Sequence, residues 1–373
     1  MQAQPARWAA LERAFPGIPT DAFTRLAAVR RGLALAFIPY AVSRLALGTA
    51  AWAANATLPF GRSQDARYPA AVQAWLAWDA QHYLQIAREG YPPSPGVNAG
   101  FFPLLPLLLH LAGGGVAASL AISFLAGLAG LAVLAGLTAA LYGESVAYRT
   151  AWVAAWWPLG FVWSAVYTEG LFLALAAGAV WAAWRQRAWL AAGLALAGGL
   201  LRPTGLFLTL SLLVLLKGRG RLLALSPVAG FVAACSLLAW RTGDPLAYAH
   251  AQTATHPVAP GDPWAGLAGA LTALRGSDWL EAAVGLVLLL LAAVLAIGLY
   301  RLPAWRGPAL ATAGALLAPA LLAGTLWSFG RYALVAFPLY WSLQRARTAV
   351  LVATLAPTAL VVTVLAGSGR LTP

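Results

Sequence analysis

Apolar runs recur along almost the whole chain, and each is long enough, or nearly so, to cross a bilayer as a helix. A hydrocarbon core of roughly 30 Å requires about 20 apolar residues in helical conformation, because backbone polar groups there must be paired within the segment. With 61% hydrophobic residues, 9% charged residues and a mean hydropathy of +0.75, this composition cannot be packed behind one water-soluble surface. The sequence therefore predicts an all-α polytopic membrane protein.

The runs predict about eleven transmembrane helices in a single domain over residues 31–368. The expected spans are 31–55, 116–141, 151–166, 169–184, 188–201, 204–216, 222–240, 280–299, 308–327, 333–344 and 348–368. Residues 1–30 are expected to form a cytoplasmic N-terminal segment, since so many mixed residues before the first apolar run are wrong for a cleavable signal peptide. Residues 369–373 form a short tail.

Short basic clusters separate many of the spans: Arg30 and Arg31, Arg149, Arg185 and Arg187, Lys217 with Arg219 and Arg221, Arg301 and Arg306, and Arg345 and Arg347. If the first cluster is cytoplasmic, strict alternation puts all of them on that side, as the positive-inside bias requires. This topology needs the segment FFPLLPLLLHLAGGG (101–115) to enter the membrane and return, because a crossing there would invert every later cluster. Two long outer loops, 57–115 and 241–279, then face the cell exterior.

The net charge of +13 does not indicate a nucleic-acid-binding protein, because the arginines lie in twos and threes between apolar runs without a continuous basic stripe. Cys235 is the only cysteine and lies within a predicted span, so an intrachain disulfide and cysteine chemistry are both excluded.

The predicted topology collects the unusual polar motifs on the outer face. They are Asp79 and His82, Glu89, YTEG (167–170), LRPTG (201–205), the 241–279 loop and FGRY (329–332). Some outer acidic residues need no functional explanation, since acidic residues remain where basic ones are excluded. Glu169 and Arg202 are different, because each lies at a turn between very short spans.

The stretch WDAQHYLQIAREGY (78–91) concentrates ionisable groups in a chain that has few of them. Pro69 suits a helix start and Gly90 a helix end, which predicts one interfacial helix over 69–89. On that helix Trp75, Asp79, His82 and Ile86 would share one face, and the flanking aromatic rings, Trp78 among them, suit the headgroup level. The spacing alone is equally compatible with a surface helix that carries a solvated aspartate.

This stretch, followed by AGFFPLLPLL (99–108), resembles the first extracytoplasmic loop of the PIG-V family, relatives of GPI mannosyltransferase II among the GT-C glycosyltransferases. That loop has Trp-Asp, a His or Tyr position, Ile-Ala, Gly-Tyr and then Phe-Pro-Leu-x-Pro. YTEGLFLAL (167–175) is similar to the family's Tyr-Ser/Thr-Glu-Ser-Leu-Phe element, with Gly170 in place of the usual serine. GRYALVAFPLY (330–340) is similar to its Arg-Tyr and Phe-Pro element, so the resemblance follows most of the chain in order.

The resemblance implies a GT-C-like fold and a mannosyltransferase (EC 2.4.1.-) that moves a hexose from a polyprenyl-phosphate donor to a hydroxyl acceptor, with inversion. A carboxylate at the headgroup level is the simplest general base for the attacking hydroxyl, which indicates Asp79. Arginines match the phosphate leaving group, and Arg202, Arg331 and Arg44 are the candidates. Arg44 lies in the outer half of the first span, where snorkelling to the headgroups is the alternative explanation.

Contacts to the sugar or acceptor are expected from His82, Glu169, Tyr332, Trp78, His250 and His256. Glu169 has an alternative role as the ion-pair partner of Arg202, and the two histidines of HAQTATHPVAPGDPW (250–264) have one as ordinary loop residues. One histidine three residues from one aspartate is a weak metal signal, so no metal and no other cofactor is expected.

Three other functions are compatible with a chain of this kind. A lipid-linked sugar transporter or flippase would also have many spans with a few buried arginines, although such proteins commonly carry matching interrupted helices in two halves. Ligation of a whole lipid-linked glycan would use the same face and leaving group. A non-enzymatic assembly partner has little reason to keep four charged residues on one face. The expected location is a multi-pass position in the cell membrane, with the site on the periplasmic or extracellular face.

Overall fold

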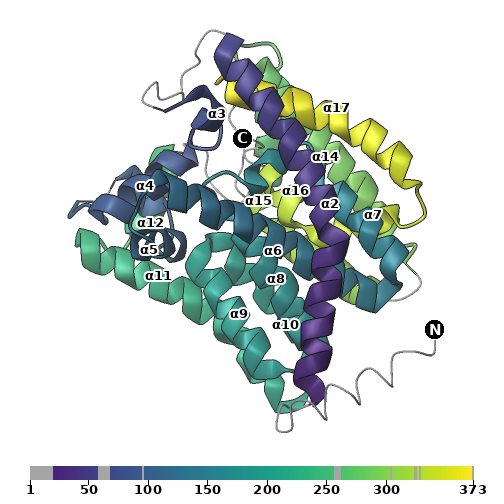
Figure 1. Cartoon of the computed structure of the whole chain (residues 1–373). Helices are drawn as coiled ribbons and strands as arrows, with labels where there is room; N and C mark the ends of the chain where they lie inside the picture. The colour runs from purple at the N-terminus through teal and green to yellow at the C-terminus, as the bar shows by residue number, and fades with distance from the viewer. Residues whose placement is uncertain are drawn as a thin grey trace.

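The computed structural model describes residues 20–57, 68–94, 96–255, 262–302, 305–322, 326 and 329–371 (Figure 1). The part of the chain so described is helical and contains no β-strand. Its α-helices are α2 (Thr20–Thr57), α3 (Ala70–Gln73), α4 (Asp79–Glu89), α5 (Leu104–Leu111), α6 (Val116–Tyr142), α7 (Glu144–Ala155), α8 (Glu169–Trp184), α9 (Ala188–Leu201), α10 (Leu208–Leu215), α11 (Ser226–Thr242), α12 (Ala247–Thr255), α13 (Pro263–Ala273), α14 (Trp279–Leu299), α15 (Arg306–Leu322), α16 (Phe329–Val335) and α17 (Thr348–Gly367). Five 3₁₀ segments lie between them: Val97–Gly100, Gly160–Trp163, Pro203–Phe207, Gly218–Leu225 and Phe337–Leu343.

Among the described residues, five helical segments are long and apolar enough to cross a membrane: Val29–Thr57, Val116–Tyr142, Gly218–Thr242, Trp279–Leu299 and Thr348–Gly367. Five shorter apolar helices accompany them, and large side chains such as Leu45, Trp240 and Leu290 point out of the bundle. An apolar exterior of this kind is what a lipid environment requires. The protein is therefore an all-α membrane protein, while eleven spans stays a prediction.

The predicted span 151–166 is wrong as a continuous helix. Helix α7 ends at Ala155, and the chain then runs through a short 3₁₀ turn before α8 begins at Glu169. Pro158 has no N–H for a helix, and Trp157 and Trp163 are completely buried in the bundle interior. Tertiary packing of these rings, which hydropathy does not report, decides the path of the segment.

Helices α6 and α8 are in backbone contact at three glycines, Gly127 and Gly130 of α6 and Gly170 of α8. A Cβ on Gly127 would lie 2.1 Å from the Trp163 carbonyl oxygen, and one on Gly130 would lie 2.7 Å from the Gly170 carbonyl oxygen. Small residues allow transmembrane helices to approach this closely, and dispersion contacts then hold them together. The crossing sets the depth of α8 and of Glu169, its first residue.

Three polar contacts join segments that the basic clusters assign to the cytoplasm. Arg31 pairs with Glu144, Arg149 donates to the Ala346 carbonyl oxygen at 3.3 Å, and Gln186 accepts from the Lys217 N–H at 3.2 Å. Each contact joins two segments that the alternating topology places on the same side, and the orientation in the cell stays a prediction.

The proline-rich segment 101–115 contains only the eight-residue helix α5, which rises about 12 Å. Hydrogen bonds tie its far end to α4, since His110 Nδ1 lies 2.8 Å from the Ala87 oxygen and Arg88 Nε donates to the Gly114 oxygen at 3.0 Å. Figure 1 shows α4, α5 and α12 gathered beside α11 at one side of the molecule. The segment begins and ends beside α4, as a returning segment must, while its depth in a membrane stays a prediction.

Candidate active site

Four charged side chains from distant parts of the chain meet in one place, which we call the ion-pair cluster: Asp79, Glu169, Arg202 and Arg331. Arg331 Nη1 contacts Asp79 Oδ2 across 252 residues of sequence and lies 3.8 Å from Glu169 Oε1. Arg202 Nη1 lies 3.1 Å from the same Glu169 oxygen. The sequence predicted all four on one face, and the structure brings them into contact.

Exposure is graded across the cluster. The Glu169 side chain is 1% exposed and Arg202 9%, whereas Arg331 is 15% and Asp79 28% exposed. Buried charges are tolerated only when they are paired, and removing one partner of a buried pair is strongly destabilising. Glu169 with Arg202 therefore forms the deep, structural half of the cluster, and Asp79 with Arg331 forms the accessible half.

Asp79 owes its position to a break in the predicted interfacial helix. The expectation of one helix over 69–89 is wrong, because α3 stops at Gln73 and α4 starts only at Asp79. Between them the Trp75 carbonyl oxygen accepts from the Val166 N–H at 3.0 Å, and Trp78 adopts a left-handed backbone with φ 56°. The hydrogen bond from Val166, in the 156–168 segment, favours the break. Trp75 therefore lies outside helix α4, which begins at Asp79.

Aromatic rings cover both arginines. The Arg202 guanidinium lies over the rings of Phe172 and Tyr332, at 5.3 and 5.4 Å, and Arg331 lies 5.5 Å from the ring centre of Tyr167. Cation–π contacts of this kind hold a guanidinium without adding negative charge. Tyr332, predicted as a sugar contact, thus lies against the cluster, and Trp78 directly precedes Asp79 in the chain.

Two tyrosines of the site were missed by the sequence analysis. Burial, followed by the nearby carboxylates of Asp79 and Glu169, raises the pKa of Tyr83. Burial and the Asp79 carboxylate likewise raise the pKa of Tyr167, whose hydroxyl donates to the Ala77 carbonyl oxygen at 3.3 Å. Both hydroxyls therefore stay protonated. Tyr83 follows Asp79 by one helical turn, a signal that could have identified it.

His82 lies one helical turn from Asp79, but its imidazole ring contacts other residues. Its Nδ1 is 2.7 Å from Asn98 Oδ1, and its ring stacks on Phe101 with centroids 4.6 Å apart. The structure places His82 beside the ion-pair cluster on α4 with its ring engaged by the following loop, so a sugar contact from this residue stays a prediction.

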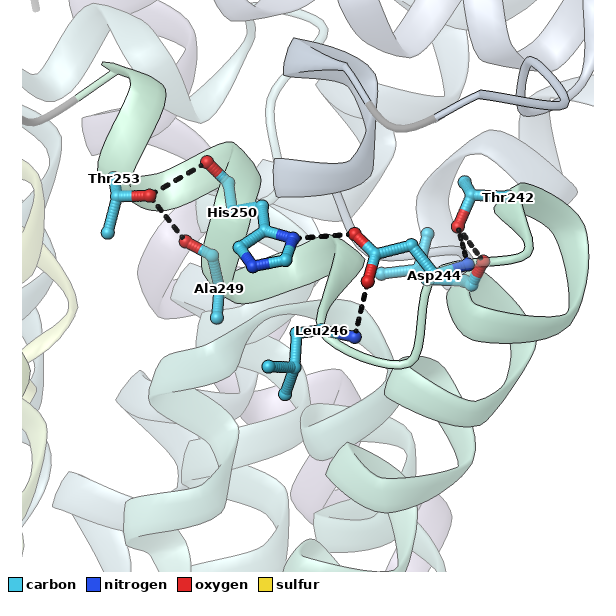
Figure 2. Close-up of polar contacts among 7 residues, drawn as sticks. Thr242, Asp244, Leu246, Ala249, His250 and Thr253 are labelled. Atoms are coloured by element: carbon cyan, nitrogen blue, oxygen red, sulfur yellow. Dashed lines mark hydrogen bonds and ion pairs between the residues drawn. The ribbon is translucent and has the colours of Figure 1, made fainter.

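The segment that follows α11 reaches the site through Tyr248, which was not predicted, and not through His250, which was. His250 is 59% exposed and pairs with Asp244 Oδ2 at 2.7 Å, while Asp244 Oδ1 accepts from the Leu246 N–H (Figure 2). Tyr248, in contrast, packs its ring on Phe102 and Phe231, and burial, followed by the neighbouring Tyr332, raises its pKa, while the nearby Arg202 opposes the rise. The structure therefore does not bring His250 to the cluster, and His256 lies outside the described residues.

Arg44 lies apart from the cluster. Its guanidinium donates to the Gly160 oxygen, to Ser164 Oγ at 3.2 Å and to the Ala155 oxygen at 3.0 Å. It also lines a largely apolar groove of about 450 Å³ together with Gly48, Trp75, Leu120, Ala121, Phe124, Leu125 and Ser164. The three arginines expected to share one phosphate are thus divided between two places, because Arg44 joins α2 to the 155–164 segment.

Within the described ranges, no three side chains of histidine, cysteine, aspartate or glutamate lie close enough to hold a metal ion. The expectation of a metal-free site stays a prediction. No family model, no curated protein and no solved structure matches the chain. A functional assignment therefore depends on the chemistry of the ion-pair cluster and on the motifs read from the sequence.

Proposed function

We propose that this protein is a membrane glycosyltransferase of the GT-C type that transfers a hexose, mannose by resemblance, from a polyprenyl-phosphate donor to a hydroxyl acceptor. One observation carries the proposal: a partly exposed carboxylate, Asp79, lies against Arg331, which is 3.8 Å from the buried Glu169, and Glu169 is in turn paired with Arg202. The site then combines a proton acceptor with cations suited to a phosphate leaving group.

The chemistry follows from these groups. The acceptor hydroxyl transfers its proton to the Asp79 carboxylate as its oxygen forms a bond to the anomeric carbon. The bond between that carbon and the phosphate oxygen breaks, and the electron pair leaves with the lipid phosphate. Arg331 and Arg202 stabilise the charge that develops on this phosphate, since guanidinium groups stay charged and present paired donors. The proton on Asp79 is afterwards released to water.

The groove beside Arg44 suits the hydrocarbon part of such a donor. Its apolar lining comes from Trp75 and from side chains of α6, with Arg44 and Gly48 contributed by α2, and Trp75 and Ser164 connect it through short segments to Asp79 and Tyr167. A polyprenyl chain could lie there while its phosphate reaches the ion-pair cluster. We assign Arg44 to the wall of this groove rather than to the reacting phosphate.

The proposed site faces the periplasm or cell exterior, with the N-terminus in the cytoplasm, because the basic clusters lie on the other membrane face. The acceptor, whether glycolipid, glycan or protein, is defined here only as a hydroxyl compound. The resemblance supplies the donor sugar.

The test uses the purified protein in nanodiscs, polyprenyl-phosphate mannose labelled in the sugar and a membrane extract as acceptor. Asp79→Asn should reduce transfer by at least about a hundredfold, the usual contribution of a general base. Asp278→Asn is the matched control, because it removes one exposed carboxylate from the outer loop without touching the ion-pair cluster, and it should keep near wild-type transfer.

Equal transfer by wild type and Asp79→Asn would show that Asp79 is not the base. If neither protein transfers sugar but the labelled donor crosses the bilayer, the transporter alternative replaces the proposal.

A further inference from the structure

Every charged group of the ion-pair cluster is already engaged. Arg331 is held by Asp79 and lies 3.8 Å from Glu169, and Arg202 is held by Glu169 at 3.1 Å. Two carboxylates thus balance two guanidinium groups. A lipid phosphate that enters this site finds each guanidinium group already in contact with a carboxylate.

The two carboxylates differ in how easily they can give up a cation. Glu169 is almost completely buried, so separation from its arginine would leave an uncompensated charge in the interior. Asp79 is the most exposed member of the cluster and can be solvated when it loses its partner. An incoming phosphate should therefore displace Asp79 from Arg331 and leave the contact between Glu169 and Arg202 intact.

We propose that the donor phosphate and Asp79 compete for Arg331, so that binding of the donor is the event that releases Asp79 to act as a base. This inference rests on the proposed function, because it takes the site to receive a lipid phosphate. It sets the order of events at the site: Asp79 is free to contact the acceptor hydroxyl only after Arg331 holds the phosphate of the leaving group. After transfer the phosphate carries an additional negative charge, and Asp79 regains Arg331 as the product leaves.

Competition has a consequence that a structural role for Asp79 does not have. Removing the carboxylate abolishes the proton acceptor and at the same time removes the competitor for Arg331. Asp79→Asn should therefore bind a lipid phosphate more tightly than wild type while it transfers no sugar. A carboxylate that merely positioned Arg331 for the phosphate would give the opposite change in affinity.

The experiment measures binding of farnesyl phosphate to the full-length protein in nanodiscs of zwitterionic lipid, by isothermal titration calorimetry. Asp79→Asn is expected to lower the Kd by about tenfold, equivalent to about 1.4 kcal/mol. Asp79→Ala should show the same direction and serves if the first variant is not recovered folded. Arg331→Gln should weaken binding at least about tenfold in both backgrounds.

Two controls separate competition from simpler effects. Asp278→Asn changes the net charge by the same unit on the outer loop and should leave the Kd within about twofold of wild type. Farnesol, which lacks the phosphate, should show no difference between wild type and Asp79→Asn. An unchanged or higher Kd in both Asp79 variants, or an equal gain in Asp278→Asn, overturns the competition.

The result is independent of sugar transfer. Tighter binding in Asp79→Asn together with an inactive wild type would keep the competition and remove the glycosyltransferase. Transfer that depends on Asp79 together with an unchanged Kd would keep the glycosyltransferase and remove the competition.

Discussion

Gly170 is the residue at which the chain departs from the motif that it otherwise resembles, and packing explains the departure. A Cβ there would lie 2.8 Å from the Gly127 nitrogen and 2.9 Å from the Gly127 Cα, both backbone atoms that cannot move aside. A serine side chain at position 170 would therefore overlap the backbone of α6. Since Gly170 follows Glu169 directly, the same contact fixes the buried carboxylate of the ion-pair cluster.

Gly170→Ser should destabilise the protein by about 1–3 kcal/mol, as overpacking of a tight interface does. Thermal unfolding in detergent, followed by intrinsic tryptophan fluorescence, would show a lower Tm. Gly193→Ser in α9 is the control, because a Cβ at Gly193 meets nothing within 4 Å. Equal melting of the two variants would mean that the α6–α8 contact is looser than described.

The charged residues of the site could be predicted singly, and the ion pair of Glu169 with Arg202, one of the two roles expected for Glu169, is confirmed. The contact between Asp79 and Arg331 could not be predicted. The alternation of spans placed Asp79, Glu169, Arg202 and Arg331 on one face, because topology depends only on where apolar runs begin and end. That Arg331 would bind Asp79 depends on how α16 packs near α4, and no spacing along the sequence reports that. Arg44 was grouped with the other arginines because hydropathy predicts how deep Arg44 lies in the membrane but not which residues surround it.

At the scale of elements, helix α12 is held at its start by a polar contact outside the membrane. Asp244 accepts from the Leu246 N–H and contacts His250 one helical turn further on (Figure 2). These hydrogen bonds, the one from Leu246 first, lower the pKa of Asp244 below its ordinary value. A carboxylate with a lowered pKa in the folded state stabilises that state above its unfolded pKa, and the contribution is lost as the pH falls.

Amide exchange in α12 should therefore be slow near neutral pH and faster, after correction for the intrinsic rate, below about pH 4, where an unperturbed aspartate titrates. Hydrogen–deuterium exchange with mass spectrometry on the 247–255 segment measures this. Asp244→Asn should exchange at a pH-independent corrected rate. If the wild-type segment is equally protected at both pH values, the contact does not hold the helix.

Long helices of the fold follow from the sequence much better than the short segments that form the site. The expected spans 31–55, 116–141 and 348–368 lie within or nearly within α2, α6 and α17, because a continuous apolar run can satisfy its backbone only as a helix. The predicted helix over 69–89 is interrupted between Gln73 and Asp79, where the hydrogen bond from Val166 to the Trp75 carbonyl oxygen outweighs local preference. The backbone of an element at the membrane surface can also form hydrogen bonds with water and neighbouring loops. The residue pattern of such an element therefore predicts its secondary structure less well.

At the scale of the whole molecule, the alternating topology predicts which residues a membrane-impermeant reagent can reach. The sole cysteine, Cys235, can be replaced by serine to give a background without thiols. In that background Ser277→Cys should react with an impermeant maleimide in intact cells, whereas Arg219→Cys should react only after the membrane is opened. The reverse pattern would invert the orientation and place the ion-pair cluster on the cytoplasmic side.

The contact between Asp79 and Arg331 also affects biogenesis. The two residues are 252 positions apart, so the carboxylate leaves the ribosome long before its cation is synthesised. Through that interval the nascent chain carries Asp79 without this partner, and insertion of α16 completes the ion-pair cluster. A ribosome that stalls before residue 331 therefore leaves a carboxylate at this place without its guanidinium group.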